Sequence, residues 1–114
     1  MHCFTDTQPP EFIDEECPHD IIRQIDASNN TALVSWDIPH GKDNSGKAPL
    51  IVEVHNLQPN SRFTAGAPHL VKYTITDDAG NVGRSCEFTI TVECTYVDVI
   101  FILIYQYLYH TTVY

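Results

Sequence analysis

The sequence is poor in basic residues. Only six lysines and arginines stand against fifteen aspartates and glutamates in 114 residues, which gives a formal net charge of −9. Nucleic acids and anionic lipid surfaces are bound by clustered cations, and no such cluster is present. Both kinds of partner are therefore disfavoured. The acidic balance is that of a solvated surface or of a protein in a calcium-rich exterior.

Recognisable catalytic and metal-binding motifs are also lacking. The six histidines include no i, i+4 pair and have no zinc-type spacing to a cysteine. His40, Asp43 and Ser45 lie close together in the sequence, but no nucleophile elbow marks the serine. We therefore expect no enzyme, no metal centre and no cofactor.

No apolar run is long enough to form a membrane-spanning helix. The longest, Val99 to Tyr105, falls well short of the roughly 20 residues that such a helix needs, and Asp98 precedes it. The N-terminus has neither a basic region nor an apolar one, so we expect no signal peptide in this chain. We interpret residues 94–114 as an apolar tail of non-native read-through, with an extra strand and a membrane contact as the less favoured alternatives.

What the sequence does have is a regular alternation of apolar and polar residues. No segment shows the 3.6-residue period of a helix, and a two-residue period is typical of strands in an all-β sandwich. Residues 20–26 form a weaker strand, and Phe12-Ile13 with Cys17-Pro18 would form a first edge strand. The four segments with clear alternation are 31–37, 50–56, 70–77 and 86–93.

Residues suited to tight turns separate these segments. Asp78 to Asn81 would close a hairpin, and Asp43 to Gly46 would form a polar loop. Trp36 and Tyr73 lie on the apolar faces of their strands and are interpreted as core aromatics. Calcium is the best-motivated ion, although turn chemistry is favoured for the same residues. Its candidate oxygen ligands are Asp37, Asp43, Asn44, Asp77, Asp78 and Asn81.

The four cysteines are widely spaced. Because no pair has Cys-x-x-Cys spacing, neither a zinc ribbon nor a thioredoxin-like site is indicated. Spacing of this kind favours a structural disulfide and an oxidising compartment, with buried free thiols as the alternative. The cysteines are Cys3, Cys17, Cys86 and Cys94.

Several of these motifs follow one another in an order that resembles the hyalin repeat. This repeat is an extracellular β-sandwich module related to immunoglobulin-like and fibronectin type III domains. The resemblance covers residues 9–93 and implies an immunoglobulin-like antiparallel β-sandwich with a disulfide between Cys17 and Cys86. The motifs are Cys17-Pro18, Trp36-Asp37-Ile38-Pro39, Asp43-Asn44-Ser45-Gly46, the segment from Tyr73 to Asn81, and Cys86.

The resemblance also implies a function. Hyalin repeats serve as non-catalytic modules in cell adhesion or matrix assembly, so we expect a secreted interaction module with a protein or matrix ligand. The alternatives are a structural spacer, or an accessory domain of a secreted enzyme or complement-type receptor. Residues 1–8 would be a linker or the remnant of a preceding module. Cys3 and Cys94 would then belong to neighbouring modules of a larger chain.

Two sites follow from these expectations. The polar loop Asp43, Asn44, Ser45 and Gly46 is the candidate ligand loop, because sandwich modules bind through end loops or sheet edges. Asn29 begins the sequon Asn29-Asn30-Thr31 and is the candidate glycosylation site.

Overall fold

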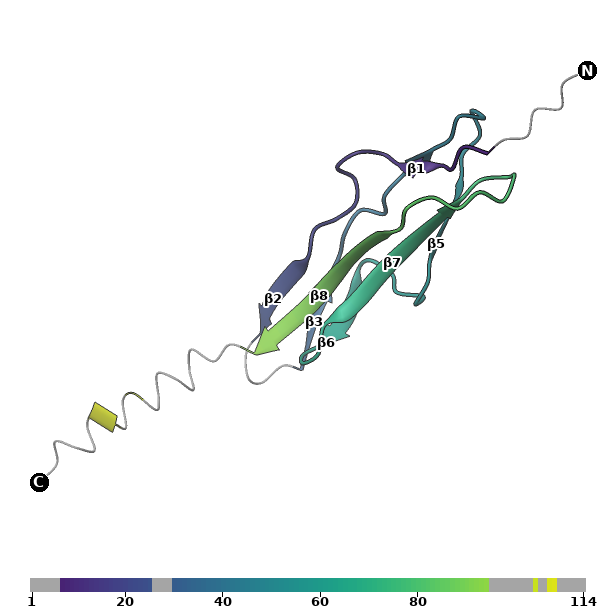
Figure 1. The fold of residues 1–114 in the computed structure, drawn as a ribbon. Coiled ribbons are helices and arrows are strands. Elements are labelled where there is room, and N and C mark those ends of the chain that lie inside the picture. The colour runs from purple at the N-terminus through teal and green to yellow at the C-terminus, as the bar shows by residue number, and fades with distance from the viewer. Residues whose placement is uncertain (1–6, 26–29, 95–103, 105–106, 109–114) are drawn as a thin grey trace, which may run out of the picture.

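The computed structural model describes residues 7–25, 30–94, 104 and 107–108 (Figure 1). Residues 104 and 107–108 are helical, and the regular elements in 7–25 and 30–94 are strands. Four of them are four or five residues long, and the two longest run side by side through the middle of the fold. In chain order they are β1 (Glu11–Phe12), β2 (Ile21–Ile25), β3 (Thr31–Val34), β4 (Gly41–Lys42), β5 (Leu50–Glu53), β6 (Ser61–Thr64), β7 (His69–Thr76) and β8 (Cys86–Cys94).

The largest sheet has the strand order β2-β8-β7-β5, and β3-β6 and β1-β4 form two smaller sheets. All pairings are antiparallel except that of β2 with β8, which is parallel. The predicted all-β sandwich is confirmed. So is the weak strand at residues 20–26, which adds β2 to the sheet.

The core lies between the large sheet and β3-β6. Alternate residues of β7 and β8 point into it, and they include Val71, Phe88 and Ile90, each no more than 2% exposed. The Trp36 ring centroid lies 5.5 Å from that of Phe88, in an edge-to-face arrangement. The inward orientation predicted for Trp36 is therefore confirmed.

A buried hydrogen bond fixes the two core aromatics that carry polar groups. The Trp36 indole N–H donates to the Tyr73 hydroxyl at 2.8 Å. Burial raises the pKa of Tyr73, while this hydrogen bond acts in the opposite direction. The polar ends of both rings are thus satisfied inside an apolar core, as buried tyrosine and tryptophan require.

The Cys17–Cys86 disulfide is present, with 5.7 Å between the two Cα atoms. Cys86 is the buried first residue of β8, whereas Cys17 lies in a half-buried segment between β1 and β2. The bond therefore fastens a segment without strand pairing to the central sheet.

The predicted first edge strand is wrong in its extent. β1 contains only Glu11 and Phe12, and it pairs with β4 in a sheet of its own. Beyond it the chain turns, since the Glu16 N–H donates to the Ile13 carbonyl and Glu15 has a φ of 68°. Pro18 lacks an N–H for a strand ladder, so the disulfide holds Cys17 where sheet pairing does not.

Two glycines allow the N-terminal segment to pack closely on the sandwich. A Cβ atom on Gly83 would lie 2.1 Å from the Pro10 carbonyl oxygen, and one on Gly41 would lie 2.3 Å from Ile75 Cδ1. Pro10, the residue before β1, is consequently buried. The chain enters the module through a fixed contact.

The disulfide should contribute a large share of the stability. Its cysteines are 69 positions apart, and closing a loop of that length in the unfolded chain stabilises the fold by roughly 4 kcal/mol. We expect Cys17→Ser/Cys86→Ser to lower the free energy of unfolding by about that amount in urea titrations. Cys94→Ser is the matched control because Cys94 is unpaired. A double variant as stable as the control would contradict the prediction.

Candidate interaction surface

The loop from Asp43 to Gly46 connects β4 to β5 and is held by its own hydrogen bonds. Asp43 Oδ2 accepts from the Ser45 hydroxyl at 2.6 Å and from the Ser45 N–H at 3.2 Å. The Gly46 N–H donates to the Asp43 carbonyl at 3.1 Å, and Gly46 has a φ of 79°. The loop therefore presents Asn44 and Ser45 to solvent from a fixed backbone.

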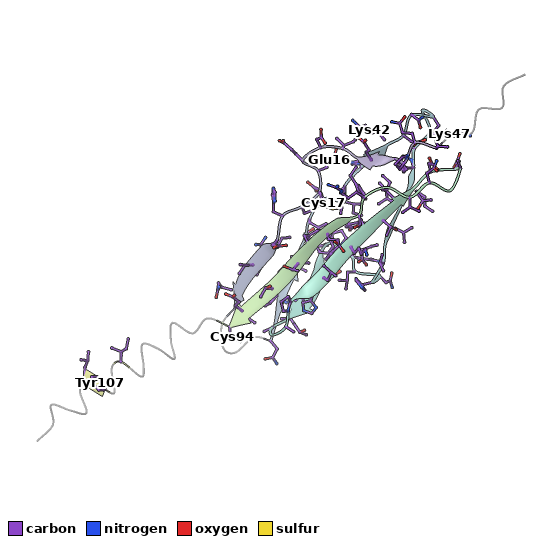
Figure 2. All side chains as sticks on the ribbon, in the orientation of Figure 1. Glu16, Cys17, Lys42, Lys47, Cys94 and Tyr107 are labelled. Carbon is purple, nitrogen blue, oxygen red and sulfur yellow. A yellow bond between two sulfur atoms is a disulfide. The ribbon has the colours of Figure 1, made fainter. Side chains whose placement is uncertain are left out.

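An ion pair connects this loop to the turn between β7 and β8. Lys47 Nζ lies 3.2 Å from Asp78 Oδ2, and both side chains are largely exposed. Figure 2 places Lys47 near Lys42 at the end of the sandwich where β1 lies. We call residues 43–47 together with residues 77–81 the end surface. The structure thus brings together two loops that the sequence separates by about 30 residues.

The turn at Asp77 to Asn81 is built around one buried carboxylate. Asp77 Oδ1 accepts from the Asn81 N–H at 2.8 Å, and Oδ2 accepts from the Asn81 side-chain amide at 2.9 Å. The Asp77 N–H also donates to the Asn81 carbonyl at 3.0 Å, and Gly80 has a φ of 88°. The predicted hairpin between β7 and β8 is confirmed. Asp77 and Asn81 fasten this turn, which is the role that turn chemistry predicts for them.

These contacts bear on the calcium candidates. Within the described ranges, no group of three or more His, Cys, Asp or Glu side chains could hold a metal ion. Both carboxylate oxygens of Asp77 already accept hydrogen bonds, and one of those of Asp43 does. Calcium binding stays a prediction, and the turn geometry accounts for Asp77 and Asn81 without it.

Sequence reasoning missed a polar contact that holds the segment before the disulfide. The Glu16 carboxylate lies 2.7 Å from His40 Nδ1 and accepts from the His40 N–H at 3.0 Å. These bonds from His40 lower the pKa of Glu16 below 4.5. A pair separated by 24 residues in irregular segments has no periodic signal, so only the folded structure reveals it.

A second missed residue is Glu53 on β5. Its side chain is 8% exposed, and its carboxylate accepts hydrogen bonds from the Leu57 N–H and from the Lys72 N–H. Glu53 and Ile51 therefore face the interior, while Leu50, Val52 and Val54 face solvent. The predicted alternation of side chains in residues 50–56 is present, but the more apolar side, with Leu50, Val52 and Val54, is the one that faces solvent.

Several predicted sites lie outside the described residues. These are the sequon asparagine Asn29, the cysteine Cys3 and almost all of the tail. Cys94, at the end of β8, is a free and partly exposed thiol (Figure 2). In the part of the chain that the structure covers, no helix has the length and apolarity to cross a bilayer.

The fold and the end surface together define a small, disulfide-linked β-sandwich module. The HYR domain model matches residues 5–92, and the chain belongs to this family. The resemblance to the hyalin repeat is thereby confirmed. No solved structure matches the chain.

Its relatives are much longer proteins. The chain is 38% identical to hyalin of Strongylocentrotus purpuratus over 87 residues, which are 76% of this chain and 7% of that protein. It is 33% identical to the sushi repeat-containing protein SRPX of Rattus norvegicus over 88 residues, 77% of this chain and 18% of that protein. The rat sushi, von Willebrand factor type A, EGF and pentraxin domain-containing protein 1 is 36% identical over 88 residues, 76% of this chain and 2% of that protein. The chain thus spans less than a fifth of each of these relatives.

The Asp77 turn can be tested with a matched pair of variants. Asp77→Ala removes the buried carboxylate that accepts two hydrogen bonds from Asn81, so it should destabilise the fold by about 1–3 kcal/mol. Asp78→Ala removes only an exposed ion pair and should cost about 0–1 kcal/mol. Thermal and urea denaturation measure both. Equal losses in the two variants would contradict the structural role of Asp77.

The contact between Glu16 and His40 predicts a pH dependence. Because the pKa of Glu16 is lowered in the folded protein, its contribution is present above pH 4.5 and is lost as the pH falls through the folded-state pKa. The melting temperature of Glu16→Gln should lie below that of the wild type at neutral pH, with the two converging in acid. The exposed Glu15 supplies the control Glu15→Gln. A gap between wild type and Glu16→Gln that is constant with pH would refute this assignment.

Proposed function

We propose that this chain is a non-catalytic module of a larger extracellular protein and that it acts in cell adhesion or matrix assembly. Membership of the HYR family and the small share of each relative that it covers support its being one part of a longer chain. The disulfide supports an oxidising, extracellular location. Neighbouring modules and an unidentified protein or matrix ligand are the partners that this function requires.

The observation that carries the binding role is the end surface. Hydrogen bonds fix the backbone of each loop, and the exposed pair of Lys47 and Asp78 connects the two loops. A surface that is ordered before binding loses less conformational entropy when a ligand docks on it. Its exposed polar groups, Asn44 and Ser45 among them, are suited to hydrogen bonding with a protein ligand.

Cell attachment to a surface coated with the oxidised, secreted chain tests this role. Asn44→Ala/Lys47→Ala removes an exposed amide and a cation from the end surface, and we expect attachment to fall about tenfold. Gln58→Ala/Arg62→Ala removes the same two kinds of group from the region before and within β6, and it should attach cells like the wild type. Equal attachment by both variants would overturn the assignment of the end surface.

The second candidate is a structural spacer, and the buried entry segment favours it. Pro10 packs against Gly83, so a preceding module would be held at a fixed angle to the sandwich. If the chain is only a spacer, cells should attach neither to the wild type nor to either variant. The same attachment assay therefore separates the two functions.

A further inference from the structure

The strand β5 ends the large sheet. One of its edges pairs with β7, and among the described residues no strand pairs with the other (Figure 1). Free strand edges are usually protected by charged side chains, proline or bulges, because they can pair with another chain.

The side chains of β5 offer little protection of this kind. On the outer face of β5, Leu50 and Val52 are 66% and 47% exposed, and Val54, which follows the strand, is 50% exposed. The one charged residue of the strand, Glu53, turns its carboxylate inward to the Leu57 and Lys72 N–H groups. By contrast, the edge strand β2 at the opposite side of the sheet carries the exposed Arg23 and Gln24, and Gln24 bonds to Glu93. The β5 edge is therefore apolar and uncharged.

The main-chain groups of β5 have a definite orientation. The Val52 carbonyl accepts from the Thr74 hydroxyl at 3.3 Å, and the Val54 N–H donates to the Lys72 carbonyl at 2.8 Å. The main-chain N–H and carbonyl groups of the even-numbered residues thus point toward β7. Since the orientation alternates along a strand, the main-chain groups of Ile51 and Glu53 point to the free edge.

The main-chain donors and acceptors at the free edge of β5 are complementary to those of a second, antiparallel copy of the strand. Ile51 presents both its N–H and its carbonyl, and Glu53 presents its N–H. The Glu53 carbonyl already accepts from the Asn56 N–H at 3.4 Å. Two residues before Ile51 stands Pro49, which has a carbonyl but no N–H. The missing donor at Pro49 and the occupied acceptor at Glu53 are thus equally spaced on either side of Ile51.

We propose that two copies of this chain pair through β5, antiparallel about a two-fold axis at Ile51. The two Ile51 residues exchange both main-chain hydrogen bonds, and the Glu53 N–H of each copy donates to the Pro49 carbonyl of the other. Leu50 then lies opposite Val52 of the second copy, which covers the exposed apolar face. This joins the two four-stranded sheets into one continuous sheet.

A second copy fits this edge better than an unrelated strand. An ordinary strand would bring an N–H toward the Glu53 carbonyl, which already has a donor, whereas Pro49 of a second copy brings none there. Two copies that each carry a net charge of −9 repel one another, but the β5 edge adds no exposed like charges to that repulsion. The side chain of Glu53, the charged residue of the strand, is only 8% exposed. The proposal does not depend on a ligand at the end surface, because the edge and the end use different residues.

Disulfide trapping tests the proposed register. In a Cys3→Ser/Cys94→Ser background, Leu50→Cys and Val52→Cys proteins are mixed under mild oxidation and separated on non-reducing gels. Opposed residues of a non-hydrogen-bonded antiparallel pair lie close enough for a disulfide. We expect a cross-linked dimer in the mixture and little in either protein alone. No cross-link, or equal cross-linking in each protein alone, would overturn the register.

Sedimentation velocity from micromolar to millimolar concentrations tests the pairing itself. Wild type should show a concentration-dependent dimer, and Val52→Lys should lose it because it places a cation in the apolar face at the axis. Ile22→Lys, which changes a residue on β2 that is 57% exposed against 47% for Val52, should keep the dimer. Circular dichroism and an intact Cys17–Cys86 bond establish that both variants are folded. A wild type that stays monomeric, or a dimer that survives Val52→Lys, would refute the proposal.

Discussion

The disulfide between Cys17 and Cys86 is the constraint on which the rest of the structure depends. It joins the first residue of β8, in the buried core, to a segment that has no strand pairing. Apart from this bond, few contacts hold that segment, among them the Ile13 N–H to the His40 carbonyl at 2.9 Å and the Thr89 N–H to Asp20 Oδ1 at 2.8 Å. A domain of this size buries a limited core, so a covalent cross-link replaces packing that it lacks. After the disulfide, the chain continues into β2, which pairs in parallel with β8 at one edge of the sheet.

That arrangement leaves two surfaces with different chemistry. The end surface is polar, ordered by its own hydrogen bonds, and suited to a protein ligand. The β5 edge is apolar and is matched to its own copy through Pro49, Ile51 and Glu53. Because the two surfaces share no residue, the proposed pairing at β5 and the proposed ligand binding at the end surface are compatible. When such modules are joined in tandem, weak contacts of each kind add up to strong attachment.

The sequence predicts the parts of this fold that are periodic or covalent. Alternation places β3, β7 and β8 and the inward side of Trp36 and Tyr73, and the family resemblance supplies the disulfide partners. The strands β4 and β6 are not predicted, because β4 has only two residues and β6 has a single apolar residue, Phe63, so neither shows an alternation. The alternation in β5 is clear, but it does not show which side faces the core. Glu53 points inward because its carboxylate accepts hydrogen bonds from the Leu57 and Lys72 N–H groups, and these contacts are visible only in the folded structure. The loop at Asp43 is predicted from its composition, whereas its pairing with the Asp78 turn depends on the sheet order.

The most direct test of this account is a peptide map of the secreted protein under non-reducing conditions, after the free thiols have been blocked. The account predicts a single cross-linked peptide pair that contains Cys17 and Cys86, with Cys94 recovered as a blocked thiol. Recovery of Cys17 and Cys86 as blocked thiols from well-folded protein would contradict it. In that case the segment between β1 and β2 would have to be held to the sheet by packing alone.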